Sequence, residues 1–455
     1  MPVFTPADLK AIGECRNILD TWSASGVSTD SRDAQTSQMF FALQGARFDA
    51  HAFVHDVAAR GIVCVVTAEA FARYASAWEK LPLVIVQDTL HALQRLAENH
   101  RQKSRAKVIG VTGSNGKTTT KEMLKAVMSK TFITQATEGN LNNEIGVPLT
   151  LLKLEADTQV AVIEMGADRP GDIETLCRII KPDFGIVTNI GKAHIERFGR
   201  VEAVAETKTA LYRHLINHGV RFVNTDDPFL RDQTELAGDL VTYGVNQSAQ
   251  FRGTILEVSD KGCISLRIEA DKSPAMLIRL GVPGLHHAYN VLAAVAVAKH
   301  MPMPDEAIVQ ALEAYRQPAN RVSFKEKNGI TVMDDTYNAN PNSMRAAMDT
   351  LMSIKTSGRK IAVLADMLEL GAMADNEHRD MGAYAAEKKV DALYLTGPLA
   401  VHAMDGAQGM KNKFYFEDKA RLIEMLKDAV QPGDVVLVKG SRGMKMEDIV
   451  QAILA

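Results

Sequence analysis

The segment from Gly110 to Thr120 constrains the fold more than any other part of the chain. It reads Gly-Val-Thr-Gly-Ser-Asn-Gly-Lys-Thr-Thr-Thr, follows the apolar run 107–111 and precedes a helical pattern over 118–130. Glycines let the backbone curl so that its N–H groups point at phosphate oxygens, and the start of a helix adds the positive end of its dipole. The sequence therefore predicts a strand, a phosphate-binding loop and a helix. The alternative is a Gly/Ser turn that precedes Lys-Thr by chance.

The glycine spacing of this loop differs from the common nucleotide-binding pattern. That pattern has a glycine at the position held here by Val111, whereas this chain has Gly113. We expect the Lys117 ammonium group to reach the β- and γ-phosphates of a nucleotide and the Thr118 hydroxyl to bind Mg²⁺. The loop residues expected to contact ATP are Gly113, Ser114, Asn115, Gly116, Lys117, Thr118 and Thr119.

The composition argues against several other classes of protein. Hydrophobic residues make up 46% and charged residues 24% of the chain, and the formal net charge is −3. This is ordinary globular composition, without the basic excess of a protein that binds nucleic acid by charge. No stretch approaches the roughly 18 apolar residues of a membrane span, and the 4 cysteines form no CxxC pair. We therefore expect a cytoplasmic protein with reduced thiols, no membrane span and no nucleic-acid partner.

The chain has 455 residues, a length that predicts about three domains. A polar run at 100–105 follows a helical segment and marks a first seam. A second seam lies at 316–321, where Pro318 disfavours a helix. We expect an N-terminal domain over 1–100, a central ATP-binding domain over 101–318 and a C-terminal domain over 319–455.

The middle and last regions carry the pattern of parallel sheets. The runs 160–165 and 185–190 are almost entirely apolar, as expected of strands covered on both faces. From about residue 322, strand and helix patterns alternate. Two alternating runs flank 259–262, which predicts a hairpin. We expect an α/β protein with a small N-terminal α/β domain, a central P-loop ATPase-like domain with a parallel sheet, and a Rossmann-like C-terminal domain.

Three polar residues follow the loop at positions where a parallel sheet presents a site. Glu164 ends an apolar run, His194 lies in the loop after the next apolar strand, and Lys208 lies in a helical pattern. Ligands bind at the carboxyl edge of such sheets, and an acidic oxygen with an imidazole could hold Mg²⁺ on triphosphate oxygens. Taken singly, each residue is as well explained as a solvated surface group.

Motifs along nearly the whole chain resemble those of the Mur ligases, which are ATP-dependent amide ligases that build the peptide of bacterial cell-wall precursors. The phosphate loop of that family has the form Thr-Gly-x-Asn-Gly-Lys-Thr, which residues 112–118 match. The other matching segments are 30–32, 40–45, 48–51, 139–150, 164–167, 188–194, 287–290, 334–341 and 438–442.

Within the family, these motifs are most similar to the branch that joins D-alanyl-D-alanine to UDP-N-acetylmuramoyl-tripeptide. Residues 1–30 lack the glycine-rich fingerprint with which other members begin, and no Asp-Asn-Pro-Arg motif of the diaminopimelate-adding branch occurs. The resemblance leaves open whether the third peptide residue is lysine or diaminopimelate. We expect a monomer.

The resemblance also implies roles for individual residues. It implies that Lys117, Glu164, His194 and Lys208 are catalytic and that Lys208 is carbamylated, which would turn it into an anionic metal ligand. Two Mg²⁺ ions are expected, with Thr118, Glu164, His194 and Lys208 as ligands. Asn290 is similar to an adenine contact, Arg321 to a nucleotide phosphate contact and Asp335 to a ribose contact. The substrate-binding residues implied are Ser31, Asn140, Asn142, Asn143, Asn338 and Asn340.

The reaction implied is amide formation through an acyl phosphate. We also expect the last domain to swing on the seam near Arg321 to close the site. One alternative is another ligase of the superfamily, either a neighbouring Mur ligase or a folylpolyglutamate synthase. The other is a non-catalytic nucleotide-binding protein that has kept the fold.

Overall fold

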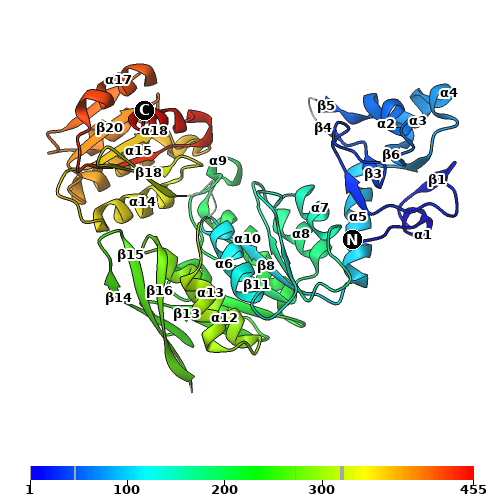
Figure 1. The fold of residues 1–455 in the computed structure, drawn as a ribbon, viewed down its shortest axis with the longest axis horizontal. Coiled ribbons are helices and arrows are strands. Elements are labelled where there is room, and N and C mark those ends of the chain that lie inside the picture. The colour runs from blue at the N-terminus through cyan, green and yellow to red at the C-terminus, as the bar shows by residue number, and fades with distance from the viewer. Residues whose placement is uncertain (1, 46–47, 272, 318–321) are drawn as a thin grey trace.

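The computed structural model describes residues 2–45, 48–271, 273–317 and 322–455. The predicted Arg321 contact therefore lies outside the described residues. Figure 1 shows three bodies in chain order, and the central body lies between the other two. Within the described ranges, none of the helices has both the length and the apolar character needed to cross a lipid bilayer.

The N-terminal body is built on a five-stranded sheet with strand order β1-β7-β6-β3-β2. All pairs in it are parallel except β1 with β7. The elements are α1 (Pro6–Lys10), β1 (Glu14–Arg16), β2 (Gly26–Ser28), β3 (Gln38–Phe41), β4 (Gln44–Gly45), β5 (Phe48–Asp49), α2 (Val54–Ala58), β6 (Cys64–Thr67), α3 (Ala68–Arg73), α4 (Ala75–Trp78) and β7 (Leu83–Val86).

A single helix, α5 (Thr89–Lys103), joins this body to the central one. Its start is capped by Asp88, whose carboxylate accepts from the His91 N–H at 2.8 Å. It packs on β3 and β6 of the first body and on α7 and α8 of the second. Leu93 and Leu96 on its buried face belong to one apolar core that includes residues of both bodies. The predicted domain boundary at 100/101 thus falls within the last turn of a continuous helix.

The central body contains a nine-stranded sheet with order β16-β15-β14-β13-β12-β11-β8-β10-β9. Strands β8 to β14 run parallel, and β14, β15 and β16 form an antiparallel meander at one edge. Its strands are β8 (Lys107–Thr112), β9 (Thr134–Ala136), β10 (Val160–Glu164), β11 (Phe184–Val187), β12 (Val220–Asn224), β13 (Leu240–Gly244), β14 (Phe251–Val258), β15 (Cys263–Ala270) and β16 (Ser273–Pro283).

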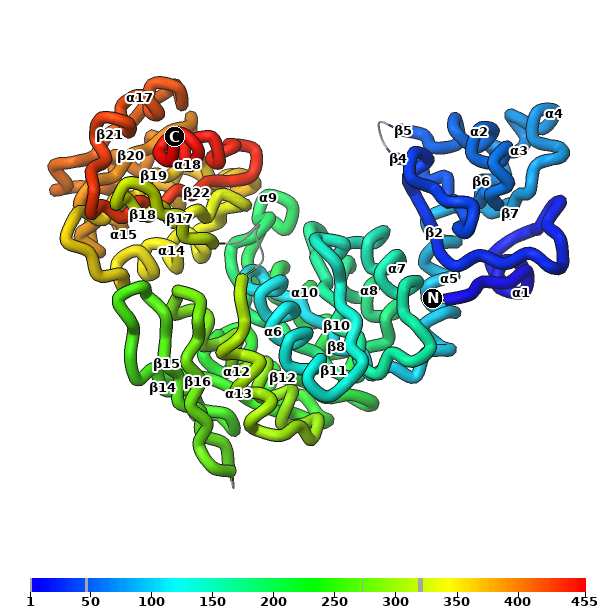
Figure 2. Tube along the Cα trace, viewed as in Figure 1, coloured from blue at the N-terminus to red at the C-terminus, as the bar shows by residue number. Residues whose placement is uncertain are grey.

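Helices cover both faces of this parallel sheet, which is why β10 is buried along its whole length. One group contains α6, α12 and α13, and another contains α5, α7, α8 and α10 (Figure 2). The hairpin predicted at 259–262 is confirmed as the turn between β14 and β15. The helices are α6 (Lys117–Met128), α7 (Gly146–Leu151), α8 (Asp172–Ile180), α9 (Ile195–Phe198), α10 (Val201–Leu215), α11 (Pro228–Arg231), α12 (His287–His300) and α13 (Asp305–Glu313).

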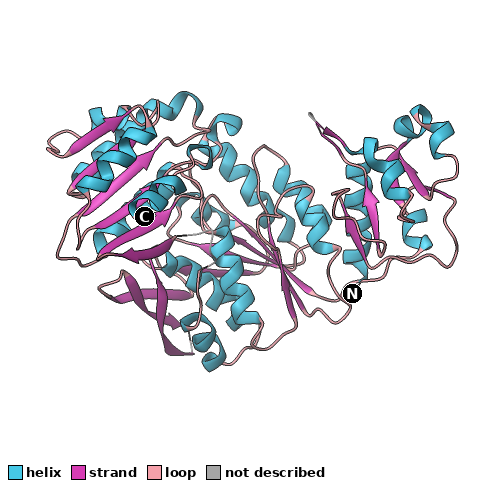
Figure 3. Ribbon diagram, turned by 45° about the horizontal axis from the view of Figure 1, so that its top comes forward, coloured by secondary structure: helices cyan, strands magenta, loops and turns pink. Residues whose placement is uncertain are grey.

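The C-terminal body is a six-stranded sheet of order β17-β18-β22-β19-β20-β21, with helices on both sides (Figure 3). Only β17 is antiparallel to its neighbour. The α/β class with parallel-sheet domains is confirmed. The elements are β17 (Ser323–Lys327), β18 (Ile330–Asp335), α14 (Pro341–Ser353), β19 (Lys360–Ala365), α15 (Ala374–Glu387), β20 (Ala392–Thr396), α16 (His402–Gly406), β21 (Lys413–Phe416), α17 (Lys419–Ala429), β22 (Val435–Lys439) and α18 (Glu447–Ile453).

Candidate active site

The loop between β8 and α6 has two glycines in the left-handed region, Gly113 with φ 143° and Gly116 with φ 78°. A Cβ on Gly113 would lie 1.9 Å from Oγ1 of Thr188. Both positions therefore require glycine because of their backbone conformation. Gly113 also requires glycine because the loop after β11 lies too close to leave room for a side chain. The first helical hydrogen bond of α6 runs from Thr120 N–H to Gly116 O, so the positive end of the helix dipole faces this loop.

The loop is fixed against the segment that follows β11. The Ser114 hydroxyl donates to the Gly191 carbonyl at 3.1 Å and accepts from the Gly191 N–H at 2.8 Å. The Asn115 N–H donates to Oδ1 of Asn189 at 3.0 Å. Two segments that are far apart in sequence, 112–118 and 188–194, thus form one structural unit at the carboxyl edge of the sheet.

Two lysines approach each other beside the loop. Nζ of Lys117 donates to the Gly113 carbonyl at 2.8 Å and to the Ser114 carbonyl at 3.3 Å, so this side chain folds back over the loop. Lys208, on α10, is only 2% exposed. Burial, and then the positive charge of Lys117, lower the pKa of Lys208 well below its ordinary value. The fold therefore disfavours the charged, protonated form of Lys208.

Glu164 ends β10 and is 1% exposed. Its Oε1 accepts from Nδ2 of Asn142 at 2.8 Å, whereas its Oε2 is buried and has no hydrogen-bond partner among the described residues. A buried carboxylate oxygen without a partner is costly unless a cation binds it. This arrangement fits a hard metal ion beside the phosphate loop.

The three asparagines of the 139–150 motif have different hydrogen-bonding roles. Asn142 orients Glu164, and its carbonyl accepts from the Gly166 N–H at 2.7 Å. Oδ1 of Asn143 accepts from the N–H of Gly146, the first residue of α7, at 2.8 Å. The Asn140 carbonyl accepts from the Asn142 N–H at 2.7 Å.

His194 contacts the C-terminal body rather than Glu164. It lies at the start of α9 with φ 55°, and its Nδ1 is 2.6 Å from Oε2 of Glu369. Within the described ranges, no three His, Cys, Asp or Glu side chains gather as a metal cluster. Among the described residues, the predicted metal ligands therefore do not belong to a cluster of three or more acidic or imidazole side chains. These predicted ligands are Thr118, Glu164, His194 and Lys208.

The other described residues predicted to contact the nucleotide form a hydrogen bond or an ion pair with side chains of the protein. Asn290, on α12, is buried, and its Oδ1 accepts from the Thr120 hydroxyl at 3.2 Å. A Cβ on Gly116 would lie 2.9 Å from the same oxygen. Asp335 pairs with the buried Lys439 at 2.7 Å, and Lys439 also donates to the Asn338 carbonyl at 2.7 Å.

Asn340 caps the start of α14, and its side chain is hydrogen-bonded to Asn115 in the phosphate loop. Ser31 lies in the N-terminal body, in the loop between β2 and β3, where its carbonyl accepts from Arg60 at 2.9 Å. The structure therefore brings Asn340 to the phosphate loop, whereas Ser31 belongs to a different body.

A cavity of about 340 Å³ lies between the central body and α14. Its walls are largely apolar, and Tyr289 on its rim donates to Asp226 at 3.0 Å. Nδ1 of His286 is buried without a hydrogen-bond partner among the described residues. Burial, and then Lys439, lower the pKa of His286 to about 4, so the ring is neutral. The lining residues are Val245, Asn246, Ile255, Leu285, His286, Ala288, Tyr289, Ala346 and Asp349.

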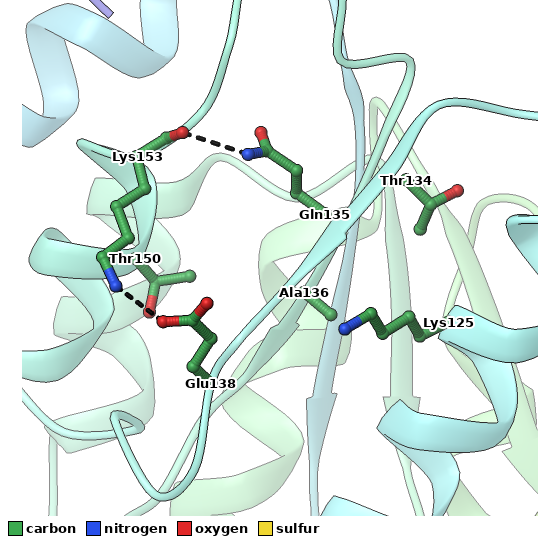
Figure 4. Close-up of a pocket in the computed structure, with 7 residues that line it drawn as sticks. All are labelled: Lys125, Thr134, Gln135, Ala136, Glu138, Thr150 and Lys153. Atoms are coloured by element: carbon green, nitrogen blue, oxygen red, sulfur yellow. Dashed lines mark hydrogen bonds and ion pairs between the residues drawn. The ribbon is translucent and has the colours of Figure 1, made fainter. Parts of the chain in front are cut away.

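A smaller cavity of about 140 Å³ lies at the β9 edge of the central sheet (Figure 4). Lys153 on one side pairs with Glu138 at 2.6 Å, which lowers the pKa of that carboxyl group. Lys125, on α6, extends toward Ala136 on the other side. The cavity is lined by Lys125, Thr134, Gln135, Ala136, Glu138, Thr150 and Lys153.

Sequence comparison shows the family. Residues 111–298 match the Mur ligase middle domain, and residues 320–442 match the glutamate ligase domain of the Mur ligases. The UDP-N-acetylmuramoyl-tripeptide–D-alanyl-D-alanine ligase of Bacillus subtilis is 34% identical, covering 94% of this chain and 93% of that protein. The chain belongs to the Mur ligase family. The Escherichia coli protein of the same name is also 34% identical to this Mur ligase, over 94% of this chain and 93% of its own.

Solved structures agree with this assignment. MurF from Acinetobacter baumannii superposes on the Mur ligase with a TM-score of 0.90 and 33% identity, covering 100% of this chain and 99% of that one. The MurF ligase from Thermotoga maritima, solved in complex with ADP, gives a TM-score of 0.82 and 28% identity over 94% and 96% of the two chains.

Sequence reasoning missed several groups at this site. Lys121 is buried on α6, with Nζ donating to the Thr137 carbonyl at 2.7 Å and paired with Glu122 at 2.6 Å. Its position on the apolar face of the helical pattern was the available signal. Glu369 and Glu377 contact the 188–197 segment from the C-terminal body, and no local pattern marks them.

Proposed function

We propose that this Mur ligase joins D-alanyl-D-alanine to UDP-N-acetylmuramoyl-tripeptide, with ATP converted to ADP and phosphate. The observation that carries the proposal is the match, over nearly the full length of both chains, to relatives named for that reaction. The glycine loop with its fixed partners supports a nucleotide-dependent reaction. We propose that the enzyme acts as a monomer in the cytoplasm.

The chemistry explains why a nucleotide is needed. A carboxylate is a poor electrophile because it is anionic and resonance-stabilised. Transfer of the γ-phosphoryl group of ATP onto the peptide carboxylate gives an acyl phosphate, which the dipeptide amine attacks to form the amide and release phosphate. Such a transfer depends mainly on positioning and on neutralising charge. Lys117, which already lies over the loop, would move its ammonium group onto the phosphates.

We propose that Thr118, Glu164, His194 and Lys208 hold two Mg²⁺ ions. The buried, partnerless oxygen of Glu164 supports this assignment. Bound Mg²⁺ would neutralise phosphate charge during phosphoryl transfer.

Lys208 supports a further part of the proposal, its conversion to a carbamate. Only a neutral amine adds to CO₂, and burial beside Lys117 lowers the pKa of Lys208 and so favours the neutral form of this amine. A carbamate would supply the anionic oxygen that the site otherwise lacks at this position. Activity that falls after removal of CO₂ and returns with bicarbonate would support the modification, and unchanged activity would count against it.

We propose that the cavity between the central body and α14 takes the adenine ring. Its lining includes Tyr289 on α12, next to Asn290 in the sequence, and its apolar walls and neutral His286 suit a purine. Asp335 is proposed to bind the ribose and Arg321 a phosphate. Ser31 is proposed to bind the UDP end of the substrate, with Asn140, Asn142 and Asn143 along the nucleotide-sugar path. Asn338 and Asn340 are assigned to substrate contacts.

The first experiment measures ADP release by the purified protein with Mg·ATP and each form of the tripeptide, lysine or diaminopimelate, with and without D-alanyl-D-alanine. Release that needs the dipeptide, with a pentapeptide product by mass spectrometry, is the expected result. Glutamate is the control acceptor, because a folylpolyglutamate synthase would use it. Release with glutamate and folate, or no release with either tripeptide, would contradict the proposal.

A further inference from the structure

The segment 191–197 contacts the C-terminal body at several points. Nζ of Lys192 pairs with Glu377, whose side chain is only 4% exposed. The Glu196 N–H donates to the Glu369 carbonyl at 3.0 Å. Figure 1 shows α9, which begins within this segment, extending from the central body toward the C-terminal one. The two bodies therefore meet at the segment that carries His194.

His194 and Glu369 face each other, and both residues have an unusual backbone conformation. Their φ angles are 55° and 62°, in the left-handed region that non-glycine residues rarely adopt. Such conformations persist where surrounding contacts hold them, and they gather at functional sites. Here they bring Nδ1 of His194 to 2.6 Å from Oε2 of Glu369.

The pairing selects which ring nitrogen remains for a ligand. An ionised carboxylate only accepts hydrogen bonds, so Nδ1 carries the proton that bonds to Glu369. In the neutral ring the lone pair is then on Nε2. Histidines that bind metals commonly use this arrangement, in which a carboxylate on the other nitrogen fixes the tautomer and raises ligand basicity.

We propose that Glu369 is a positioning residue for His194, so that the metal site is complete only while the C-terminal body is docked. This rests on the proposed function, which makes His194 a Mg²⁺ ligand. Glu369 itself contacts neither metal nor substrate in the proposal. It acts by orienting the imidazole from across the domain boundary.

The competing explanation is that Glu369 only holds the two bodies together. Glu377 provides the matched control, because it makes the other ion pair from the same body to the same segment but does not contact His194. A loss of docking alone would affect the Glu369→Ala and Glu377→Ala variants in the same way.

The test titrates Mn²⁺ as the probe metal into the full chain in the presence of ADP, with free Mn²⁺ followed by electron paramagnetic resonance. We expect Glu369→Ala to weaken Mn²⁺ binding about tenfold, as loss of such outer partners does. Glu377→Ala should stay within about twofold of the unaltered protein, and Glu369→Gln, whose amide oxygen still accepts from Nδ1, should recover most of the affinity. Unchanged affinity in Glu369→Ala, or equal losses in both alanine variants, would overturn the proposal.

Kinetics provide a second readout. Glu369→Ala should raise the KM for Mg²⁺ while kcat at saturating Mg²⁺ stays within about twofold, whereas a docking defect would lower kcat at every Mg²⁺ concentration. If the unaltered protein forms pentapeptide but Glu369→Ala shows no change in metal dependence, the positioning role alone fails. If the unaltered protein forms no pentapeptide and binds no Mn²⁺ with ADP, the proposed function and the positioning role both fail.

Discussion

Asn115 and Asn340 exchange two side-chain hydrogen bonds although 225 positions separate them. Nδ2 of Asn340 donates to Oδ1 of Asn115 at 2.8 Å, and the return bond measures 3.3 Å. Asn340 also caps α14, because its Oδ1 accepts from the Ser343 N–H at 2.9 Å. The Asn340 side chain therefore bonds both to the phosphate loop and to the start of a helix in the C-terminal body.

Two substitutions at Asn340 should separate its two roles. Asn340→Ala removes both the cap and the pairing, and we expect a loss of about 1 kcal/mol in unfolding free energy together with weaker ATP binding. Asn340→Asp keeps an oxygen for the cap but loses the donor to Asn115, so it should keep most of the stability and share the loss in ATP affinity. Calorimetric titration with ADP and urea unfolding measure the two effects. ADP binding by Asn340→Asp equal to that of the unaltered protein would show that the pairing does not matter.

The buried amine of Lys208 should make stability depend on pH. Its folded pKa is lowered, so the unfolded chain binds the extra proton, and unfolding free energy rises with pH up to the ordinary lysine value near 10.5. Lys208→Met removes this cost. In CO₂-free buffer at pH 7, we expect its melting temperature to exceed that of the unaltered protein by at least about 2 °C. The difference should shrink as the pH approaches 10, and a difference that grows with pH would contradict the assignment.

Gly113 should tolerate no side chain. In Gly113→Ala the new Cβ would meet Thr188 Oγ1 at 1.9 Å, in a backbone conformation with φ 143°. We expect kcat/KM for ATP to fall by at least about 100-fold, a loss of roughly 3 kcal/mol of transition-state stabilisation. Gly139→Ala is the control, because Gly139 also has positive φ but nothing lies within 4 Å of its added Cβ. Equal losses in both variants would point to backbone strain alone.

Lys439 should stabilise the C-terminal body through Asp335. Its side chain is 2% exposed and Nζ lies 2.7 Å from Oδ2 of Asp335. Lys439→Met removes the buried ammonium group from this ion pair, and we expect a loss of about 2–4 kcal/mol in unfolding free energy and a higher KM for ATP. Lys411→Met, at an exposed position, is the matched control. Thermal unfolding followed by circular dichroism measures the difference, and similar melting temperatures for the two variants would refute it.

Local patterns were sufficient for the elements that local interactions determine. The apolar run over 160–165 contains β10, and the helical pattern that carries Lys208 is α10. The loop over 112–118 was also predictable, because a strand, glycines and a helix start occur together in the sequence. The class of the fold followed from the alternation of these units.

Local sequence patterns could not predict the contacts between bodies. The partners of His194 and Asn115 lie in the C-terminal body, and only tertiary packing brings Glu369 and Asn340 to them. Burial of Lys208 likewise depends on where α10 packs rather than on its own sequence. The predicted domain boundaries and residue roles remain predictions.

The continuous helix α5 (Thr89–Lys103) has a mechanical consequence. A helix of this length is a rod of about 22 Å, and it packs on elements of both bodies. In this structure one continuous helix sets the separation between the N-terminal body and the central body that carries the phosphate loop. Under the proposed function, a substrate gripped at its nucleotide end in the first body must reach the loop with its carboxylate. The enzyme would then select its substrate by peptide length. A precursor that spans this distance would place its carboxylate at the loop, and a shorter one would not.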